Sequence, residues 1–244
     1  MKRVLYILLL CSFAGCNKED AWDLFKTRGD QKEIFMDLPS FQSIKIYNNV
    51  EVILRQDTCN RAHLIGWSNL LPKVSIAVNA DGELCIEDHN KHNFARSYDN
   101  KTTIYLSFKE PVSSLFFYGN RSLTNMDTLS LSSLLIIGEK AGGSIHLTLQ
   151  TEWLTIGASG NVDITVCGES STLALTYWGK APFDFSQLMV NNAAIDHHGS
   201  NDVFINVRDI INASMFDYGN IYYKGNPSAV NVTRKGKGNV YPIP

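Results

Sequence analysis

The sequence predicts an all-β fold, a parallel β-solenoid built from stacked coils. The first observation is a glycine that recurs at steps of 19, 20, 20 and 19 residues, at Gly160, Gly179, Gly199, Gly219 and Gly238. The second is that apolar and polar residues alternate on both sides of each glycine, as strands with one buried face do. The third is that four or five units match. A β-sandwich would explain the alternation but not the fixed spacing.

The composition limits the classes of function. The chain has 244 residues, 44% of them hydrophobic and 19% charged, which is typical of a folded protein. Its formal net charge of -2 gives no general attraction to nucleic acid. No glycine-rich phosphate loop opens a helix and no CxxC spacing occurs, so neither a cofactor nor a metal site is expected.

Residues 1–16 are predicted to be a lipoprotein signal peptide that ends at a lipidated Cys16. Lys2 and Arg3 precede an apolar segment too short to span a bilayer, and Ala14 and Gly15 stand directly before Cys16. This arrangement resembles the lipobox of bacterial lipoproteins; the alternative is a plain secretory signal with an incidental cysteine. Acylation would anchor the chain, because each buried methylene contributes about 0.8 kcal/mol.

Residues 17–40 are predicted to be a tether between this anchor and the folded domain. They begin with Asn17-Lys18-Glu19-Asp20, which resembles the signal that sends some lipoproteins to the outer face of the outer membrane. A solvated linker is the simpler interpretation. Together with the lipobox, this segment predicts a lipid-anchored protein of the bacterial outer membrane, exposed at the cell surface.

The β-helix domain is predicted to span residues 41–244. Residues 41–56 alternate on both sides of an Asn-Asn turn, with Asn49 at the place that Gly160 takes in its own coil. Asparagine tolerates a positive φ better than most residues. Further strands are expected at 63–67, 74–78, 84–86 and 103–108, with a tight turn at Asp81-Gly82, a projecting loop at 88–101 and two looser coils at 112–150.

The chain resembles a known family over about residues 41–240. The similarity rests on FxxIxIxxNVEVILRQ, which starts at Phe41, and on GNIYYKGNPSAVNVTRKGKGNV, which starts at Gly219. The family is described as "putative auto-transporter adhesin, head domain", and this sequence departs from its glycine at Asn49. The resemblance implies a right-handed single-stranded β-helix on a lipoprotein or secreted anchor. It implies no catalytic residue.

Stacking should bury one side of every coil, because a single coil cannot cover its own apolar face. The inward side chains are expected to be Ile156, Val162, Ile164, Val166, Leu173, Leu175, Phe183, Phe185, Ile195, Val203, Ile205 and Val207. The turn glycines should then lie in one row along an edge, about 4.8 Å apart.

Residues beside this glycine row form the candidate ligand-binding edge. They are Tyr118, Tyr177, Trp178, Asp196, His197, His198, Asp217 and Tyr218. Trp178, His198 and Tyr218 on adjacent coils would make an aromatic strip roughly 10 Å long. Aromatic strips bind sugar rings, with neighbouring polar groups fixing their orientation. The alternative is that the stacked rings only stabilise the ladder.

An enzyme is the second hypothesis. Asp196, Asp202 or Asp217 would supply the acid or base of a polysaccharide lyase or glycoside hydrolase. No supporting motif accompanies these residues, so we expect a non-enzymatic protein that binds a glycan or another cell-surface ligand. After processing, three cysteines remain. If a disulfide forms, Cys59 and Cys85 are the expected pair, but the favoured interpretation is that all three are small buried hydrophobes.

Overall fold

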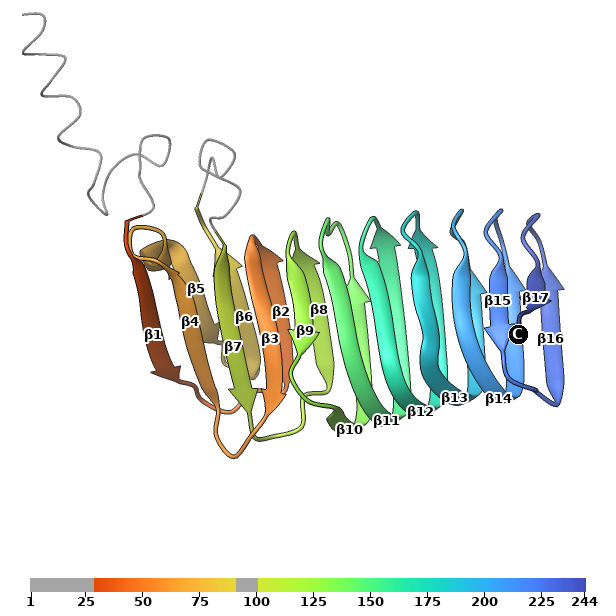
Figure 1. Ribbon diagram of the computed structural model, residues 1–244, viewed down its shortest axis with the longest axis horizontal. Helices are drawn as coiled ribbons and strands as arrows, with labels where there is room; N and C mark the ends of the chain where they lie inside the picture. The colour runs from red at the N-terminus through yellow and green to blue at the C-terminus, as the bar shows by residue number, and fades with distance from the viewer. Residues whose placement is uncertain (1–28, 91–100) are drawn as a thin grey trace, which may run out of the picture.

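The protein is a rod of stacked β-coils (Figure 1). The structure is a computed structural model that describes residues 29–90 and 101–244. Among these residues, no helix is long and apolar enough to cross a membrane. One 3-10 helix, η1 (Leu71–Lys73), accompanies the strands β1 (Gln31–Asp37), β2 (Ser43–Asn48), β3 (Val50–Gln56), β4 (Arg61–Trp67), β5 (Val74–Val78), β6 (Glu83–Asp88), β7 (Thr102–Phe108), β8 (Ser114–Gly119), β9 (Ser122–Asn125), β10 (Leu129–Gly138), β11 (Ser144–Gly160), β12 (Asp163–Gly179), β13 (Phe183–His197), β14 (Val203–Met215), β15 (Ile221–Lys224), β16 (Ala229–Arg234) and β17 (Val240–Pro242).

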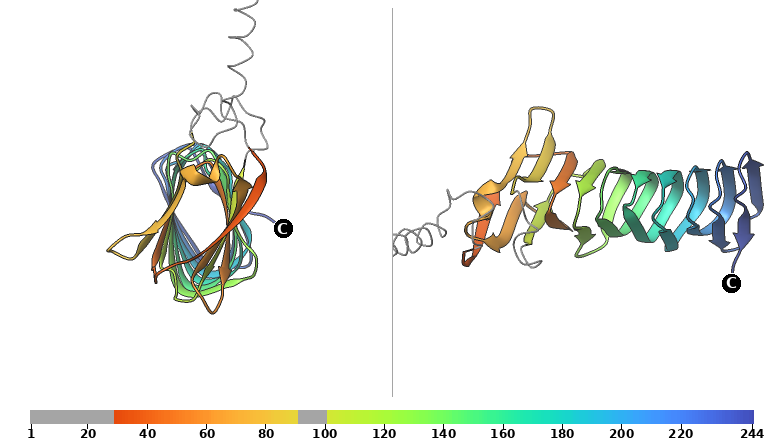
Figure 2. Two further views of the ribbon diagram at one scale, coloured as in Figure 1. Left: turned by 90° about the vertical axis from the view of Figure 1, so that its left-hand side faces the viewer. Right: turned by 90° about the horizontal axis from the view of Figure 1, so that it is seen from above.

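The regular coils are long strands, each bent once and followed by a short turn. β11 pairs with β12 in parallel from Ser144–Asp163 through Gly160–Gly179, so one coil advances by 19 residues. The bend divides each coil into two faces, and the view along the axis in Figure 2 shows the resulting flattened tube. The all-β solenoid predicted from the sequence is therefore confirmed.

A single apolar core fills the tube along its length. The twelve inward side chains predicted from the alternation are each at most 2% exposed. Such side chains stack on their counterparts in the neighbouring coil, so every coil completes the core of the next. The prediction of the core face was correct for both halves of the regular coils.

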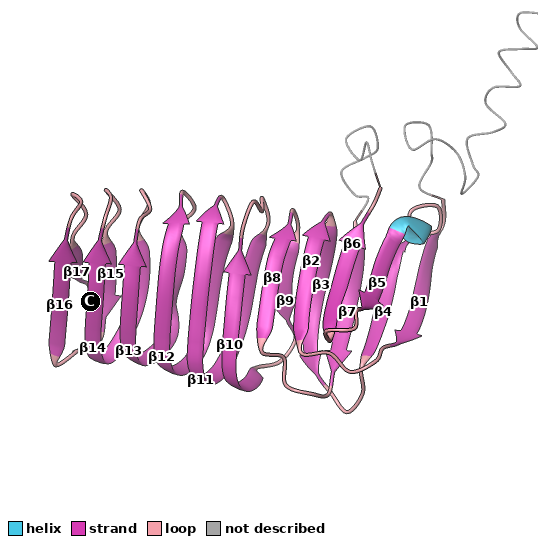
Figure 3. Ribbon diagram, turned by 180° about the vertical axis from the view of Figure 1, so that it is seen from behind, coloured by secondary structure: helices cyan, strands magenta, loops and turns pink. Residues whose placement is uncertain are grey.

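The turn glycines lie in one row, along the upper edge in Figure 3. Gly160 is paired with Gly179, and the Gly219 amide donates to the Gly199 carbonyl oxygen at 3.1 Å. Of these four glycines, only Gly160 has a positive φ, of 85°. At Gly199 the reason is space instead, because an added Cβ would lie 2.2 Å from Cε1 of Tyr177.

The first predicted turn differs by one residue. Asn48, not Asn49, has the positive φ, at 65°, and it pairs with Gly119 in the neighbouring coil. Asn48 therefore occupies the glycine row. The tight turn predicted at Asp81-Gly82 is present, since β5 and β6 pair antiparallel on either side of it and Gly82 has a φ of 73°.

The coils near the N-terminal end are not stacked in chain order. β2 lies between β6 and β8, and β3 lies between β7 and β9. The coil made by β6 and β7 thus packs on the N-terminal side of the earlier coil made by β2 and β3. The alternation could not predict this step back, because either edge of a coil offers the same parallel hydrogen-bonding pattern.

The N-terminal end of the rod is closed by antiparallel strands. β4 pairs antiparallel with β7, and β1 pairs antiparallel with β4 from Gln31–Trp67 to Asp37–Arg61. The sequence analysis placed residues 31–37 in the tether and expected order from Phe41, whereas here they form the last strand of the sheet. A cap of this kind is needed because an open solenoid end exposes unpaired backbone groups.

The described cysteines form no disulfide. Cys59, Cys85 and Cys167 are free thiols of intermediate exposure. The Cys59–Cys85 disulfide that the sequence left open is therefore absent. The three thiols are half-buried, whereas the favoured interpretation expected small buried hydrophobes. Cys16 lies outside the described residues.

Candidate functional site

An aromatic strip lies beside the glycine row, but its third member is not the predicted one. The rings of Trp178 and His198 stack at 3.6 Å between centroids, and those of His198 and Phe216 at 3.9 Å, each pair within 7° of parallel. Phe216 replaces the predicted Tyr218 because the turn before Gly219 is two residues longer than the turn before Gly199. Tyr218 stands apart and is 62% exposed.

Face-to-face stacking covers the surfaces that a sugar ring would use. His198 has a ring on both faces, and Phe216 has His198 on one face and the Lys235 ammonium on the other, 4.8 Å from its centroid. Trp178 is 59% exposed and its other neighbour in the ladder is the small Ser159. Only this one ring face is open, so the geometry favours a stabilising ladder over an extended sugar platform.

Two of the predicted edge residues point into the core. Tyr177 and His197 are 1% and 0% exposed, and their rings meet edge to face at 5.2 Å. Burial raises the pKa of Tyr177 to about 12, and its hydroxyl donates to the Ala181 carbonyl oxygen. These side chains support the turns from inside and cannot contact a ligand.

The protonation of His197 follows from its partners. The Gly199 amide donates to Nδ1 at 3.2 Å, so Nε2 carries the proton that it shares with the Asn201 carbonyl oxygen at 3.0 Å. Burial lowers the pKa of His197, although the hydrogen bond with Asn201 opposes the shift. The ring is a neutral core histidine that fixes the turn.

Tyr118 belongs to a separate stack. Its ring lies 5.0 Å from that of Tyr47, within 14° of parallel. Tyr118, Glu139, Ser159 and Trp178 occupy the same position in four successive coils, as the strand pairing shows. The predicted edge is therefore two aromatic stacks, separated by two coils that carry Glu139 and Ser159 at this position instead of an aromatic residue.

The predicted acidic residues do not form one catalytic group. Asp196 is exposed on an outer face between Thr176 and Ser214. Asp202 instead accepts hydrogen bonds from the backbone and side-chain nitrogens of Asn220, at 2.9 and 3.1 Å, and so stabilises a turn. In the described ranges, no three His, Cys, Asp or Glu residues are grouped so that they could hold a metal ion.

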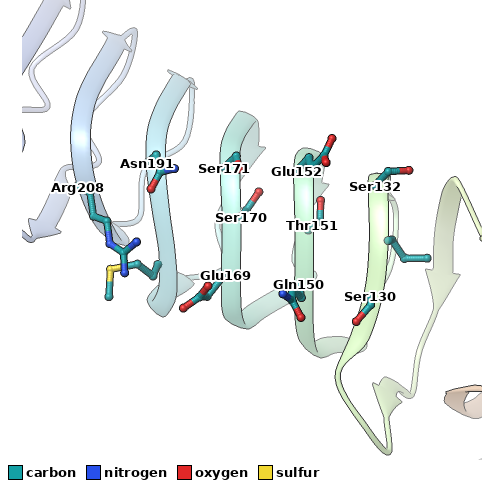
Figure 4. Close-up of a pocket in the computed structure, with 12 residues that line it drawn as sticks. Ser130, Ser132, Gln150, Thr151, Glu152, Glu169, Ser170, Ser171, Asn191 and Arg208 are labelled. Atoms are coloured by element: carbon teal, nitrogen blue, oxygen red, sulfur yellow. The ribbon is translucent and has the colours of Figure 1, made fainter.

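A polar groove lies along the bends, on the opposite edge from the glycine row (Figure 4). It has a volume of about 510 Å³ and crosses five consecutive coils, from β10 to β14. At about 4.8 Å per coil, this corresponds to a length of roughly 19 Å. Its lining residues are Ser130, Leu131, Ser132, Gln150, Thr151, Glu152, Glu169, Ser170, Ser171, Met189, Asn191 and Arg208.

The side chains that line the groove form three parallel rows, two outer and one central, which run from coil to coil. The pairing of β10, β11 and β12 aligns Ser130 with Gln150 and Glu169, and Figure 4 shows the second row running through Glu152 and Asn191. Thr151 and Ser170 lie between the rows. The first row belongs to the parallel ladder. The second row stands at the bend, where the pairing skips one residue in each coil between paired residues on either side.

The polar groups of the groove are largely unpaired within the protein. The side chains of Gln150, Glu152, Glu169, Asn191 and Arg208 make no hydrogen bond or ion pair with any described residue. Thr151 Oγ1 is buried without a hydrogen-bond partner in the same part of the chain. Some polar residues elsewhere bond from coil to coil, as Asn231 does to Asn212 at 3.0 Å. The groove gathers polar side chains that lack such bonds along one hollow.

The groove is not among the sites predicted from the sequence. Gln150-Thr151-Glu152 and Glu169-Ser170-Ser171 recur midway between the turn glycines, and this recurrence was the available signal. It was missed because short polar groups of this kind also occur at any solvated bend. Only the bend itself shows that residues of neighbouring coils line one hollow.

The comparisons with known proteins agree with the fold. The crystal structure of a "putative adhesin" from Bacteroides fragilis NCTC 9343 has a TM-score of 0.78 at 20% identity, covering 88% of this chain and 97% of that one. Two structures from Parabacteroides distasonis ATCC 8503 each cover 88% of this chain and 98% of their own: a "putative adhesin", with a TM-score of 0.71 at 18% identity, and a "putative lipid binding protein", with 0.67 at 14%.

A search of curated proteins finds no match. A sequence model of one family, described as "Putative auto-transporter adhesin, head GIN domain", matches residues 40–227. This match spans most of the solenoid, from the start of its ordered coils to β15, and it agrees with the structural neighbours. The chain therefore belongs to the family described as "Putative auto-transporter adhesin, head GIN domain".

Proposed function

We propose that this protein is a lipid-anchored surface solenoid that binds an uncharged, hydroxyl-rich glycan in the groove between β10 and β14, without cleaving it. The observation that carries the proposal is the row of unpaired polar side chains across five coils. Amide, hydroxyl, carboxylate and guanidinium groups together offer both donors and acceptors, as a sugar hydroxyl requires. The volume of 510 Å³ lies within the range of small-molecule sites, about 300–1,000 Å³.

The groove is favoured over the aromatic edge for a geometric reason. A glycan needs several hydrogen-bonding groups that are not already used. The groove side chains named above have no hydrogen-bond partner among the described residues, so their groups are available. The aromatic strip presents one open ring face, that of Trp178, which suits at most one sugar unit. Membership of an adhesin family and the lipobox before Cys16 support display of the groove at the outer surface of the outer membrane.

Binding without cleavage is supported by the setting of the carboxylates. Glu152 and Glu169 are exposed side chains on the outside of the rod. Enzymes that cleave glycosidic bonds hold two carboxyl groups at a fixed separation on either side of the bond. An open groove of this kind offers recognition instead.

The test is calorimetric titration of the full chain in detergent with neutral oligosaccharides of three to five units. Gln150→Ala and Asn191→Ala should each weaken binding by about two- to tenfold, since a lost hydrogen bond costs about 0.5–1.4 kcal/mol. Asp196→Asn, an exposed change outside the groove, is the control and should leave the affinity unchanged. Absence of binding by the wild type across the panel, or equal losses in the control, would refute the proposal.

The same samples distinguish binding from catalysis. Each polysaccharide is incubated with wild type and with the Asp196→Asn variant, and the new reducing ends are measured. No release is expected from either protein. Release by wild type that stops in the variant would instead establish the enzyme hypothesis, with Asp196 as the acid or base.

A further inference from the structure

The charge of the rod changes sign at its C-terminal end. Residues 218–244 contain four basic residues and no acidic one, whereas the preceding described residues contain 11 Lys or Arg and 20 Asp or Glu. The basic residues are Lys224, Arg234, Lys235 and Lys237. A weakly acidic chain therefore has one strongly basic segment, and that segment is confined to the last coil.

The last coil forms the tip of the rod. β15 and β17 pair with each other on one face, and β16 pairs with β14 on the other, with no further strand beyond them in the described part of the chain. Figure 1 places this coil at the opposite end from β1. The basic segment is thus gathered on a surface and not spread along the solenoid.

The cations of the tip are positioned and unneutralised. Arg234, Lys235 and Lys237 are exposed, and within the described residues none of the four cations forms an ion pair. Lys235 Nζ lies 4.8 Å from the Phe216 centroid, and Lys237 Nζ lies 5.2 Å from that of Tyr218. These ring contacts hold the two ammonium groups in place while leaving their charge free for a partner.

We propose that this tip is a second binding surface, for a polysaccharide that carries carboxylate, sulfate or phosphate groups. Four cations attract such a polymer, and the exposed ring of Tyr218 beside Lys237 offers an apolar contact for a sugar unit. If the chain is anchored through Cys16, as the proposed function requires, the tip is the end of the rod opposite the one that leads to the anchor. The acidic body then repels the same polymer, so contact is restricted to the end of the rod.

The experiment measures binding of the full chain in detergent to heparin, to polygalacturonate and to neutral dextran, between 50 and 300 mM salt. Binding to both anionic polymers but not to dextran is expected, with an affinity that falls as salt rises because counterions are released. Binding to heparin alone assigns the tip to sulfated glycans, and binding to polygalacturonate alone to carboxylated ones. Absence of binding to both at 50 mM salt would overturn the proposal.

Paired substitutions locate the surface. The change of Lys235 and Lys237 to Gln should weaken heparin binding at least tenfold and lower the salt slope by about two. Changing both to Arg should preserve binding. The matched control changes Lys140 and Lys180 to Gln, since these are exposed lysines beside the glycine row in the middle of the rod. Equal losses in the tip and control variants would refute a site at the tip.

The same variants test whether the tip binds a second copy of the protein instead. Suppose that the rod self-associates in sedimentation, that the tip variant abolishes this, and that no polyanion binds. The tip then contacts the acidic body of a second copy, and the proposal is wrong. The groove variants Gln150→Ala and Asn191→Ala should bind heparin as wild type does. If the groove proposal fails, heparin binding is still present; if the tip proposal fails, binding of neutral oligosaccharides is still present. The two failures are therefore distinguishable.

Discussion

The substitution Gly199→Ala tests why the turn row consists of glycine. Its added Cβ would lie 2.2 Å from Cε1, 2.6 Å from Cδ1 and 2.8 Å from Cζ of Tyr177. Carbon atoms in contact are about 3.5–4.0 Å apart, so the ring would have to move by more than 1 Å. It has little freedom to do so, because it is 1% exposed and packs against Phe183 and His197.

Overpacking of this kind destabilises a protein by about 1–3 kcal/mol, and the fixed ring places Gly199→Ala at the upper end. For a domain of this size, about 3 kcal/mol lowers Tm by about 6–12 °C. Gly160→Ala is the comparison, since its added Cβ meets only Lys140 N at 3.8 Å while its φ of 85° disfavours alanine. That change should cost about 1–2 kcal/mol, entirely through the backbone.

A double-mutant cycle identifies the colliding group. Tyr177→Val lacks the δ, ε and ζ atoms that the new methyl group would meet, so Gly199→Ala should cost far less in that background. Thermal and urea unfolding, followed by tryptophan fluorescence and far-UV circular dichroism, supply the four free energies of unfolding. Equal effects of Gly199→Ala in the presence and absence of the tyrosine ring would show that the collision is not the cause.

Three further predictions concern the strip, the buried histidine and the anchor. Trp178→Ala should lower Tm by a few degrees, because a stacked pair contributes about 0.5–1.5 kcal/mol, while glycan titration of the groove stays unchanged; loss of groove binding would contradict the assignment. Because His197 has a lowered pKa, stability should be constant above pH 6.5 and fall below it, by at most about 1.4 kcal/mol per pH unit, as the unfolded state takes up the proton first. Urea midpoints at pH 7.5, 6.5 and 5.5 should therefore fall less steeply in His197→Gln, and identical slopes would argue against a neutral buried ring. Cys16→Ser should move the protein from the membrane fraction to the soluble fraction, whereas retention in the membrane would exclude lipidation as the anchor.

The candidate site was only partly predictable. The row of residues before each glycine correctly brought Trp178 and His198 together, because each follows directly on the paired residues Tyr177 and His197 and directly precedes its turn glycine. The third position failed at Tyr218, since two extra residues in one turn shift the register and put Phe216 in the stack. Sequence reasoning also placed Tyr177 and His197 on the edge, although strand alternation from Leu175 and Ile195 puts both inside the tube.

The polar groove was beyond the sequence for a different reason. Gln150 and Glu169 are 19 residues apart, and nothing in their chemistry distinguishes them from solvated residues on any bend. Their unpaired state is visible only once the neighbouring coils show which polar groups bond to one another, as Asn125 does with the Thr148 backbone.

The sequence by itself determined the solenoid, its period, its inward face and its glycine row. These are local properties. The alternation sets which side of each strand is apolar, and every coil has the same apolar face that its neighbour must cover. The tertiary structure alone decided the order in which the coils near the N-terminal end are stacked, the strand β1 that closes that end and the hollow formed at the bends. A parallel backbone edge accepts any coil of matching shape, so the choice of partner depends on the packing of the whole rod.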